Sequence, residues 1–139
     1  MITVPLSVCL KLLNSIRRIG PKEKCGFFGI KKGVLAEIVP VRNSSKEFYR
    51  FEIKFLDRMM GLAKLCLRGK LDEIGFYHTH SNGSGRLSKE DEATLFAIRS
   101  LLFLIVTPMN LNFYRVKTRN KVKTIETVDW TFGISKEKS

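Results

Sequence analysis

Cysteine is scarce in this sequence and is not arranged in pairs. The three cysteines, Cys9, Cys25 and Cys66, are widely spaced and odd in number, and they form no CxxC motif. Disulfide frameworks and thiolate zinc sites both depend on paired or closely spaced cysteines. The sequence therefore argues against both kinds of site, and we expect buried, reduced thiols.

Long hydrophobic runs are also absent. The longest apolar run, Leu101–Val106, is far shorter than the roughly 20 residues that a helix needs to cross a bilayer. The basic residues of the N-terminal segment follow its apolar stretch, and no small-residue cleavage site is present, unlike in a secretory signal. These features predict a soluble, cytoplasmic protein with no membrane partner.

Acidic residues are few, because 13 aspartates and glutamates face 25 lysines and arginines, for a formal net charge of +12. Such an excess is the first criterion for a nucleic-acid binder, but here it is spread along the chain. The exception is Tyr114–Val122, which has no acidic residue and four basic ones: Arg115, Lys117, Arg119 and Lys121. A solvated hairpin or a surface for an acidic protein partner explains this 115–123 segment better than nucleic acid, which stays the less favoured alternative.

No repeat, low-complexity tract or linker divides the chain, so residues 1–139 are expected to form a single domain. Two segments have the apolar period of an amphipathic helix. The first helix stops at Gly20 and Pro21, and its expected buried residues are Leu6, Leu10, Leu13 and Ile16. The second covers residues 54–67 and stops at Gly69, and its expected buried residues are Phe55, Met59, Leu62, Ala63 and Cys66.

Short strands alternate with these helices. Residues 25–30 and 34–41 predict a hairpin around Gly33, and a further strand is expected near Phe48–Phe51. Ile74–Thr79 predicts a buried strand, a helix restarts at Ser88, and LLFLIVTP predicts a core strand. A closing hairpin is expected from residues 111–116 and 122–128. This order of elements predicts an α+β protein with an α/β/α layered, mixed sheet.

The stretch HTHSNGSGRLSKED, residues 78–91, contains both histidines of the chain. Residues two apart in a strand share a face and lie about 6.6 Å apart, so His78 and His80 can direct two imidazoles at one ion. After the glycine-rich loop, Asp91 in the first turn of the next helix can supply a third ligand. Three protein ligands leave one tetrahedral position for water, which is the pattern of a catalytic zinc site.

Two other interpretations of this stretch need no metal. Ser88 and Asp91 have the spacing of a capping box, with serine at the N-cap and an acid at N3. Backbone N–H groups of the SNGSG loop could instead cradle a phosphate before the helix, although the chain has no GxxxxGK[ST] motif. From the spacing alone, the metal site and the ordinary capped helix stay equally open.

Two distant segments resemble one known family. FYHTHSNGSGRLSKED, residues 76–91, is similar to the HxHx(10)D motif of the JAMM/MPN-domain zinc metalloproteases, including the serine three residues before the aspartate. PKEKCGFFG, residues 21–29, resembles the family's other signature, a glutamate two residues before a Cys-Gly that opens the first strand. Weaker similarity through VPVRNSSKEFYRFEIKFLDRMM extends the resemblance to roughly residues 5–115. The chain is most similar to the compact bacterial and archaeal members.

The resemblance implies the family's fold, which is cytidine-deaminase-like, and its chemistry, which is hydrolysis of an amide. It implies one catalytic zinc ion per chain, bound by His78, His80 and Asp91. Glu23 would be the general acid/base, and Ser88 would hydrogen-bond the developing oxyanion. The implied substrate is a ubiquitin-like protein or a β-grasp sulfur carrier, cut at its C-terminus through an isopeptide or a linear amide bond. The implied activity is therefore that of a deubiquitinase-like isopeptidase or a C-terminal peptidase.

The chain departs from the family's usual pattern at two places. Ser81 and Leu87 stand where members commonly have proline, which affects the rigidity of the loop but none of the ligands. With 48 residues after Asp91 (139 − 91 = 48), there is little room for a large insertion that grips ubiquitin.

Two competing functions remain. A non-catalytic MPN interaction module is disfavoured by the intact set of ligands and catalytic residues. A DNA-associated protein like the RadC group would suit the charge, but PKEKCGFFG matches the peptidase branch, and the chain has no room for an N-terminal helical DNA-binding domain.

Overall fold

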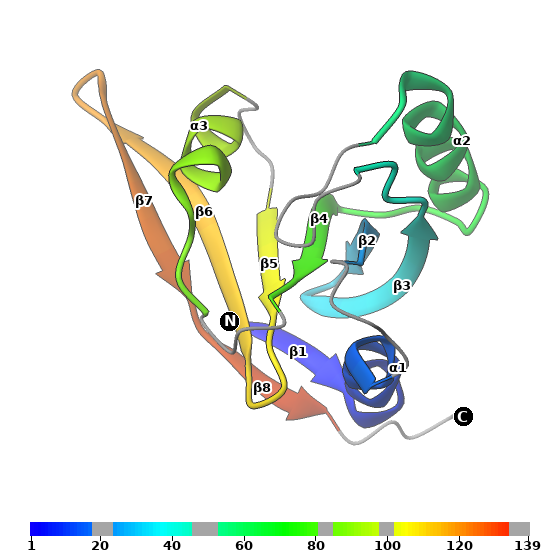
Figure 1. Ribbon diagram of the computed structural model, residues 1–139. Coiled ribbons are helices and arrows are strands. Elements are labelled where there is room, and N and C mark those ends of the chain that lie inside the picture. Colours follow the sequence, from blue (N-terminus) through cyan, green and yellow to red (C-terminus); the bar gives the residue numbers. More distant parts are fainter. Residues whose placement is uncertain (18–23, 46–52, 81–84, 98–101, 134–139) are drawn as a thin grey trace.

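The computed structural model describes residues 1–17, 24–45, 53–80, 85–97 and 102–133, and it is shown in Figure 1. Its helices are α1 (Leu6–Arg17), α2 (Phe55–Cys66) and α3 (Lys89–Ala97). Its strands are β1 (Ile2–Pro5), β2 (Cys25–Lys31), β3 (Val34–Val41), β4 (Glu73–Thr79), β5 (Leu102–Val106), β6 (Leu111–Arg119), β7 (Val122–Val128) and β8 (Trp130–Gly133). Among these residues, no helix is both long enough and apolar enough to span a membrane.

The strands form one mixed sheet in the order β7-β6-β5-β4-β2-β3-β1-β8. Strand β1 runs parallel to β3 and to β8, and β4 runs parallel to β5, whereas the remaining neighbours are antiparallel. Strands β7 and β8 follow one another along the chain, yet they occupy opposite ends of this order (Figure 1). Because β7 pairs with β6 and β8 pairs with β1, one stretch of chain borders both ends of the sheet.

Each face of the sheet buries its own apolar cluster. On one face, Val8, Cys9 and Leu12 of α1 pack with strand residues that include Phe28 and Leu104. On the other face, Leu65 of α2 and Leu95 of α3 pack with a second set of strand residues: Cys25, Phe27, Val39, Phe76, Phe103 and Ile105. The sheet therefore lies between α1 and the pair α2 and α3, which confirms the predicted α+β class and the α/β/α layers.

The predicted hairpins are confirmed. In the turn between β2 and β3, Lys32 and Gly33 have φ of 51° and 77°, and Asn120 and Lys121 have φ of 50° and 66° between β6 and β7. Two successive residues with positive φ are typical of the two-residue turns that match the twist of antiparallel strands. The strand expected near Phe48–Phe51 lies outside the described residues.

The predicted buried face of the first helix is wrong at Leu6 and Leu10, although Leu13 packs partly buried against the core as predicted. Leu6 and Leu10 are more than half exposed, whereas Val8, Cys9 and Leu12 are buried. The reason is that apolar residues occur on more than one side of α1, so their period predicts the helix but does not select its inner face. The sequence did not predict strand β1, which ends at Pro5, directly before α1 begins at Leu6.

The predicted face of the second helix is wrong at four of its five residues, and only Leu62 packs partly buried against the core as predicted. Phe55 and Met59 are exposed, as are Ala63 and Cys66, while Gly61 and Leu65 face the sheet. The cause is a close approach of α2 to the sheet at Gly61, where an added Cβ would lie 2.8 Å from Cγ2 of Val41. A glycine gives no apolar signal, so the contact side of this helix is invisible to a search for hydrophobic period.

Gly75 on β4 makes room for an aromatic contact between β2 and β6 on one face of the sheet. The Phe28 ring packs edge-on against Phe113, with ring centroids 6.1 Å apart and an interplanar angle of 82°. An added Cβ at position 75 would lie 2.5 Å from Cε1 of Phe28 and closer still to Cζ. Both rings are almost fully buried, so the space beside Gly75 is part of the packed core.

We expect Gly75→Ala to lower the free energy of unfolding by about 1–3 kcal/mol, the usual cost of overpacking a core. Chemical denaturation measures this change. In a Phe28→Leu background, which lacks Cε and Cζ, the same substitution should cost less, because the two residues are in contact. An equal cost in both backgrounds would mean that the Phe28 ring is not the obstacle.

Candidate metal centre

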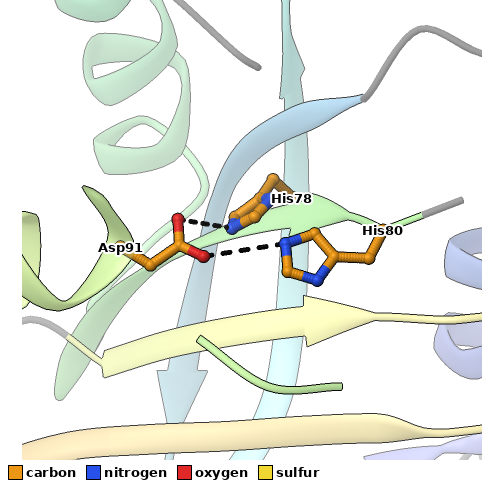
Figure 2. Close-up of side chains that lie close together, drawn as sticks. All are labelled: His78, His80 and Asp91. Carbon is orange, nitrogen blue, oxygen red and sulfur yellow. Dashed lines mark ion pairs between the residues drawn. The ribbon is translucent and has the colours of Figure 1, made fainter. Parts of the chain in front are cut away.

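The two histidines lie at the end of β4, a strand held on both sides. His80 N–H donates to the Val106 carbonyl at 2.9 Å and so continues the pairing with β5. On the other side, Thr79 N–H donates to the Lys24 carbonyl and Lys24 N–H donates to Thr79 Oγ1, both at 2.9 Å. Because the backbone around the histidines is bonded on both sides, their imidazoles leave the sheet at fixed positions (Figure 2).

Asp91 reaches both imidazoles from the first turn of α3. Its Oδ1 lies 3.1 Å from Nε2 of His78, and its Oδ2 lies 3.6 Å from Nε2 of His80. The two imidazole rings are 4.6 Å apart between centroids. One ligand atom from each of the three residues falls within a group no more than 4.8 Å across. The predicted triad is therefore brought together, and its donors converge as a single metal ion would require.

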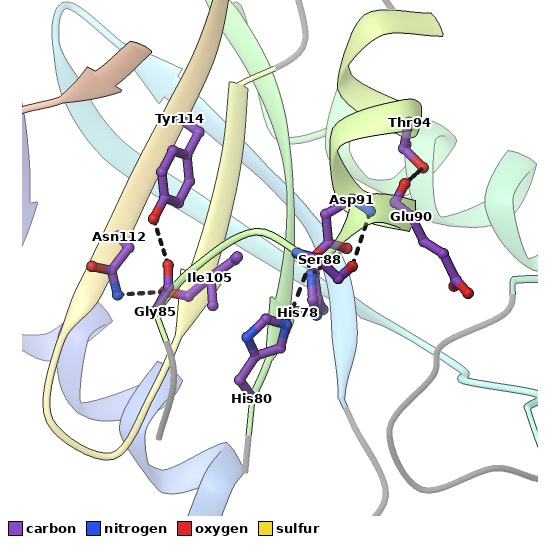
Figure 3. A network of polar contacts seen from close by, with 10 residues as sticks. All are labelled: His78, His80, Gly85, Ser88, Glu90, Asp91, Thr94, Ile105, Asn112 and Tyr114. Carbon is purple, nitrogen blue, oxygen red and sulfur yellow. Dashed lines mark hydrogen bonds and ion pairs between the residues drawn. The ribbon is translucent and has the colours of Figure 1, made fainter. Parts of the chain in front are cut away.

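Ser88 and Asp91 also form the reciprocal bonds of a capping box. Ser88 N–H donates to Asp91 Oδ2 at 2.9 Å, and Asp91 N–H donates to Ser88 Oγ at 3.1 Å, as Figure 3 shows. The helix interpretation and the metal interpretation were alternatives at the level of sequence, but the geometry satisfies both. The same carboxylate that closes the capping box faces the histidines, so the cap fixes the direction in which Asp91 presents its oxygens.

The centre is buried among aromatic rings. His78 is 1% exposed, and its ring lies edge-on to Phe103 at 5.4 Å between centroids. Burial alone would raise the pKa of Asp91, but the hydrogen bonds and charge of the histidines, with the Ser88 N–H, hold that pKa well below its usual range. An ionised carboxylate that is 3% exposed needs a compensating charge, which a divalent cation between these donors would supply.

The described residues do not include Glu23, the expected general acid/base. They do include its neighbour Lys24, whose backbone is bonded to Thr79 between the two histidines. Cys25 pairs directly opposite His78 in the β2–β4 register and is buried, and its thiol donates to the Val41 carbonyl at 3.6 Å. Cys25 and Cys9 are therefore buried thiols, as expected, whereas Cys66 is exposed, which contradicts that expectation.

The basic segment is the hairpin of β6 and β7, and part of its charge is paired. Arg115 donates to both carboxylate oxygens of Glu73, at 2.8 and 3.1 Å, and the Lys117 ammonium lies 3.8 Å from Glu126. Its binding to a protein or to nucleic acid stays a prediction.

Two residues of the same hairpin contact the segment that precedes α3, although the sequence did not select them. Tyr114 and Asn112 contact Gly85, on the segment that leads to Ser88. No motif marks them, because the contact joins distant parts of the chain.

Comparisons with known proteins agree with this arrangement. Residues 5–118 match the family described as prokaryotic homologues of the JAB domain. A solution structure of a protein from Desulfitobacterium hafniense is 20% identical, with a TM-score of 0.76, and the match covers 99% of this chain and 96% of that one. The crystal structure of a JAB1/MPN domain protein from Archaeoglobus fulgidus is 18% identical, with a TM-score of 0.59, covering 94% of this chain and 98% of that one.

At this level of identity, both solved structures show a shared fold and no more. No curated protein matches the chain.

We expect the triad to bind one divalent transition-metal ion per chain. Replacing His80 by alanine should weaken binding by more than the roughly 10- to 100-fold that loss of a supporting residue costs, because a ligand itself is removed. Titration with zinc against a chromogenic chelator measures the affinity. Glu126→Gln, which removes a carboxylate on β7 away from the centre, serves as the control, and equal affinity in both variants would contradict the assignment.

Proposed function

The chain belongs to the prokaryotic homologues of the JAB domain, and on that premise we propose that it is a zinc-dependent metallopeptidase. Its reaction would be hydrolysis of an amide bond at the C-terminus of a ubiquitin-like or β-grasp sulfur-carrier protein. The observation that supports this best is the convergence of His78, His80 and Asp91 at the edge of the sheet. The family includes metalloisopeptidases, which makes a hydrolytic role the first to test.

The donor set suits zinc. Two imidazole nitrogens and one carboxylate oxygen are common zinc ligands, and three protein ligands leave a position open for chemistry. When bound, zinc polarises a carbonyl group and lowers the pKa of water to near 7. His78, His80 and Asp91 would hold the ion, and the capping box would keep Asp91 aimed at it.

Ser88 is suited to stabilise the negative charge that develops on the substrate carbonyl oxygen. Its side chain is exposed at the N-terminus of α3, next to the buried triad. Because Ser88 Oγ accepts the Asp91 N–H, the hydroxyl's own hydrogen is available to donate to the substrate. The N-terminus of the helix adds partial positive charge at the same place. A donor fixed before the reaction begins is the arrangement that lowers the barrier most effectively.

Glu23 is the proposed general acid/base. It would take a proton from the attacking water and deliver it to the leaving amine, a role suited to a carboxylate that is not itself a ligand. The assignment is supported by the next residue, Lys24, whose backbone bonds to Thr79 between the two histidines. With Ser88 and the triad, this assigns a role to each of the five site residues.

The substrate class is proposed from the family and from charge. The chain has a formal charge of +12, which suits an acidic β-grasp partner. The leaving amine would come from a lysine side chain in an isopeptide or from the next residue in a linear chain. Both amides present the same carbonyl to the triad, so the same five residues would serve both reactions.

We expect Glu23→Gln to abolish cleavage while leaving metal binding unchanged, because the amide is isosteric but cannot accept a proton from water and pass it on near neutral pH. Release of a reporter fused to the C-terminus of a β-grasp protein measures cleavage, and zinc per chain is determined on the same samples. Glu126→Gln is the matched control. Retained cleavage in Glu23→Gln would remove Glu23 from the mechanism.

Salt should slow cleavage of an acidic substrate by reducing kcat/KM more than kcat. The reason is that ionic strength screens the attraction between the basic protein and its partner, with a Debye length of about 10 Å at 0.1 M, and so slows encounter. A short neutral peptide amide, cut at the same bond, should show little dependence on salt. Equal salt effects on both substrates would argue against an acidic partner.

A further inference from the structure

The segment that enters α3 is tied to strand β6 by two side chains. The Tyr114 hydroxyl donates to the Gly85 carbonyl at 2.5 Å. The Asn112 side chain lies against the α-carbon of Gly85 and points its amide at the Ile105 carbonyl, 3.5 Å away. Figure 3 shows both side chains reaching from β6 toward this segment, on the side away from α3. We call Tyr114, Asn112 and Gly85 the β6 clamp.

Gly85 is required by space. Its φ lies outside the left-handed region, so an alanine could adopt the backbone conformation. A methyl group at this position, however, would lie 2.6 Å from Cγ and 2.8 Å from Oδ1 of Asn112, and closer still to Nδ2. The segment can therefore lie this close to β6 only because position 85 has no side chain.

The clamp acts only three residues before Ser88. Between them, Leu87 packs against the apolar cluster below α3, and Ser88 then closes the capping box with Asp91. The segment is thus attached first to β6, then to the core, and finally to the helix. A shift at Gly85 would be passed along this short connection to the Ser88 hydroxyl.

The clamp and the histidines are positioned by neighbouring strands of the same sheet. Asn112 pairs with Ile105, and Ile105 pairs with His78, so the three residues form one row across β6, β5 and β4. Tyr114 lies two residues further along β6, in the next row on the same face, with Phe103 and Phe76. Through the clamp, the same sheet that fixes the imidazoles also fixes the entry to α3.

We propose that Tyr114 and Asn112 are positioning residues, which hold the Gly85–Ser88 segment at the distance from β4 where the Ser88 hydroxyl meets the substrate carbonyl. This inference rests on the proposed hydrolytic function. The clamp supplies none of the three candidate metal ligands, so its loss should affect turnover more than metal binding.

The state of Tyr114 agrees with this role. Burial raises the pKa of its hydroxyl, although the charge of Arg86 acts in the opposite direction. The hydroxyl therefore keeps its proton at neutral pH and can donate a hydrogen bond to the Gly85 carbonyl.

The first test is Tyr114→Phe in the zinc-loaded protein, which removes one oxygen and keeps the ring. We expect kcat to fall about 10- to 100-fold, the size of effect that a small misplacement of a reacting group produces. KM and zinc per chain should be unchanged. Amide exchange at Ser88 should become about five- to tenfold faster, as loss of one hydrogen bond allows. Thr124→Val, which removes another side-chain bond to β6, is the control and should change neither quantity.

The second test uses the close contact itself. Gly85→Ala should lower kcat and speed exchange at Ser88 as Tyr114→Phe does, because the new methyl group pushes the segment off β6. Adding Asn112→Ala to that variant should restore part of both, because the obstructing amide is gone and the Tyr114 hydroxyl can again reach the Gly85 carbonyl. A general loss of stability would not be reversed by a second truncation.

The outcomes separate the two proposals. A wild-type protein that binds zinc but cleaves no β-grasp fusion would refute the proposed function, and exchange at Ser88 would still decide whether the clamp holds the segment. An active protein in which Tyr114→Phe changes neither kcat nor exchange would overturn the clamp. Failure of Asn112→Ala to rescue Gly85→Ala would also overturn it.

Discussion

The centre depends on one carboxylate with two sets of partners. Asp91 accepts the Ser88 N–H and so completes the start of α3, and the same two oxygens face His78 and His80 on the strand. Helix and strand are therefore registered to each other by a group that both require. The carboxylate is buried and ionised. If it lost either set of partners, the desolvation cost of its buried charge would no longer be compensated. The arrangement is stable only when helix, strand and ligand geometry agree.

The parts of this centre that sequence predicted were local. The spacing of His78 and His80 on a strand, and of Ser88 and Asp91 at a helix start, follows from the repeat of each element. The inner faces of α1 and α2 were predicted only in part: Leu13 and Leu62 pack against the core, but Leu10 and Met59 are exposed. The reason is that an apolar period does not distinguish a packed side from an exposed one. On α2 the decisive residue is Gly61, whose contact with the sheet depends on having no side chain. Strands β1 and β8 were missed because each is only four residues long.

Tyr114 and Asn112 show a different limit. They lie on a strand that the sequence predicted correctly, and Tyr114 is the first residue of the segment that it marked for its charge. Their contacts join Gly85 to residues 27 and 29 positions away (112 − 85 and 114 − 85), and they exist because β6 stands next to β5, which stands next to β4. Such a contact follows from the order of strands, which no single segment contains. The charge of the same hairpin is also partly used within the fold, since Arg115 is bonded to Glu73.

The closing of the sheet by β8 has a consequence for the order of folding. Ile2 pairs with Trp130, so the apolar cluster beneath α1 is completed by strands from the two ends of the described chain. During synthesis, the cluster around α2 and α3 can form from residues 25–105 before β8 has left the ribosome. Contacts between such distant residues cost the most chain entropy and slow the final step. A nascent chain would thus hold its histidines and Asp91 in place while Ile2 and Val4 still lack their pairing with β8.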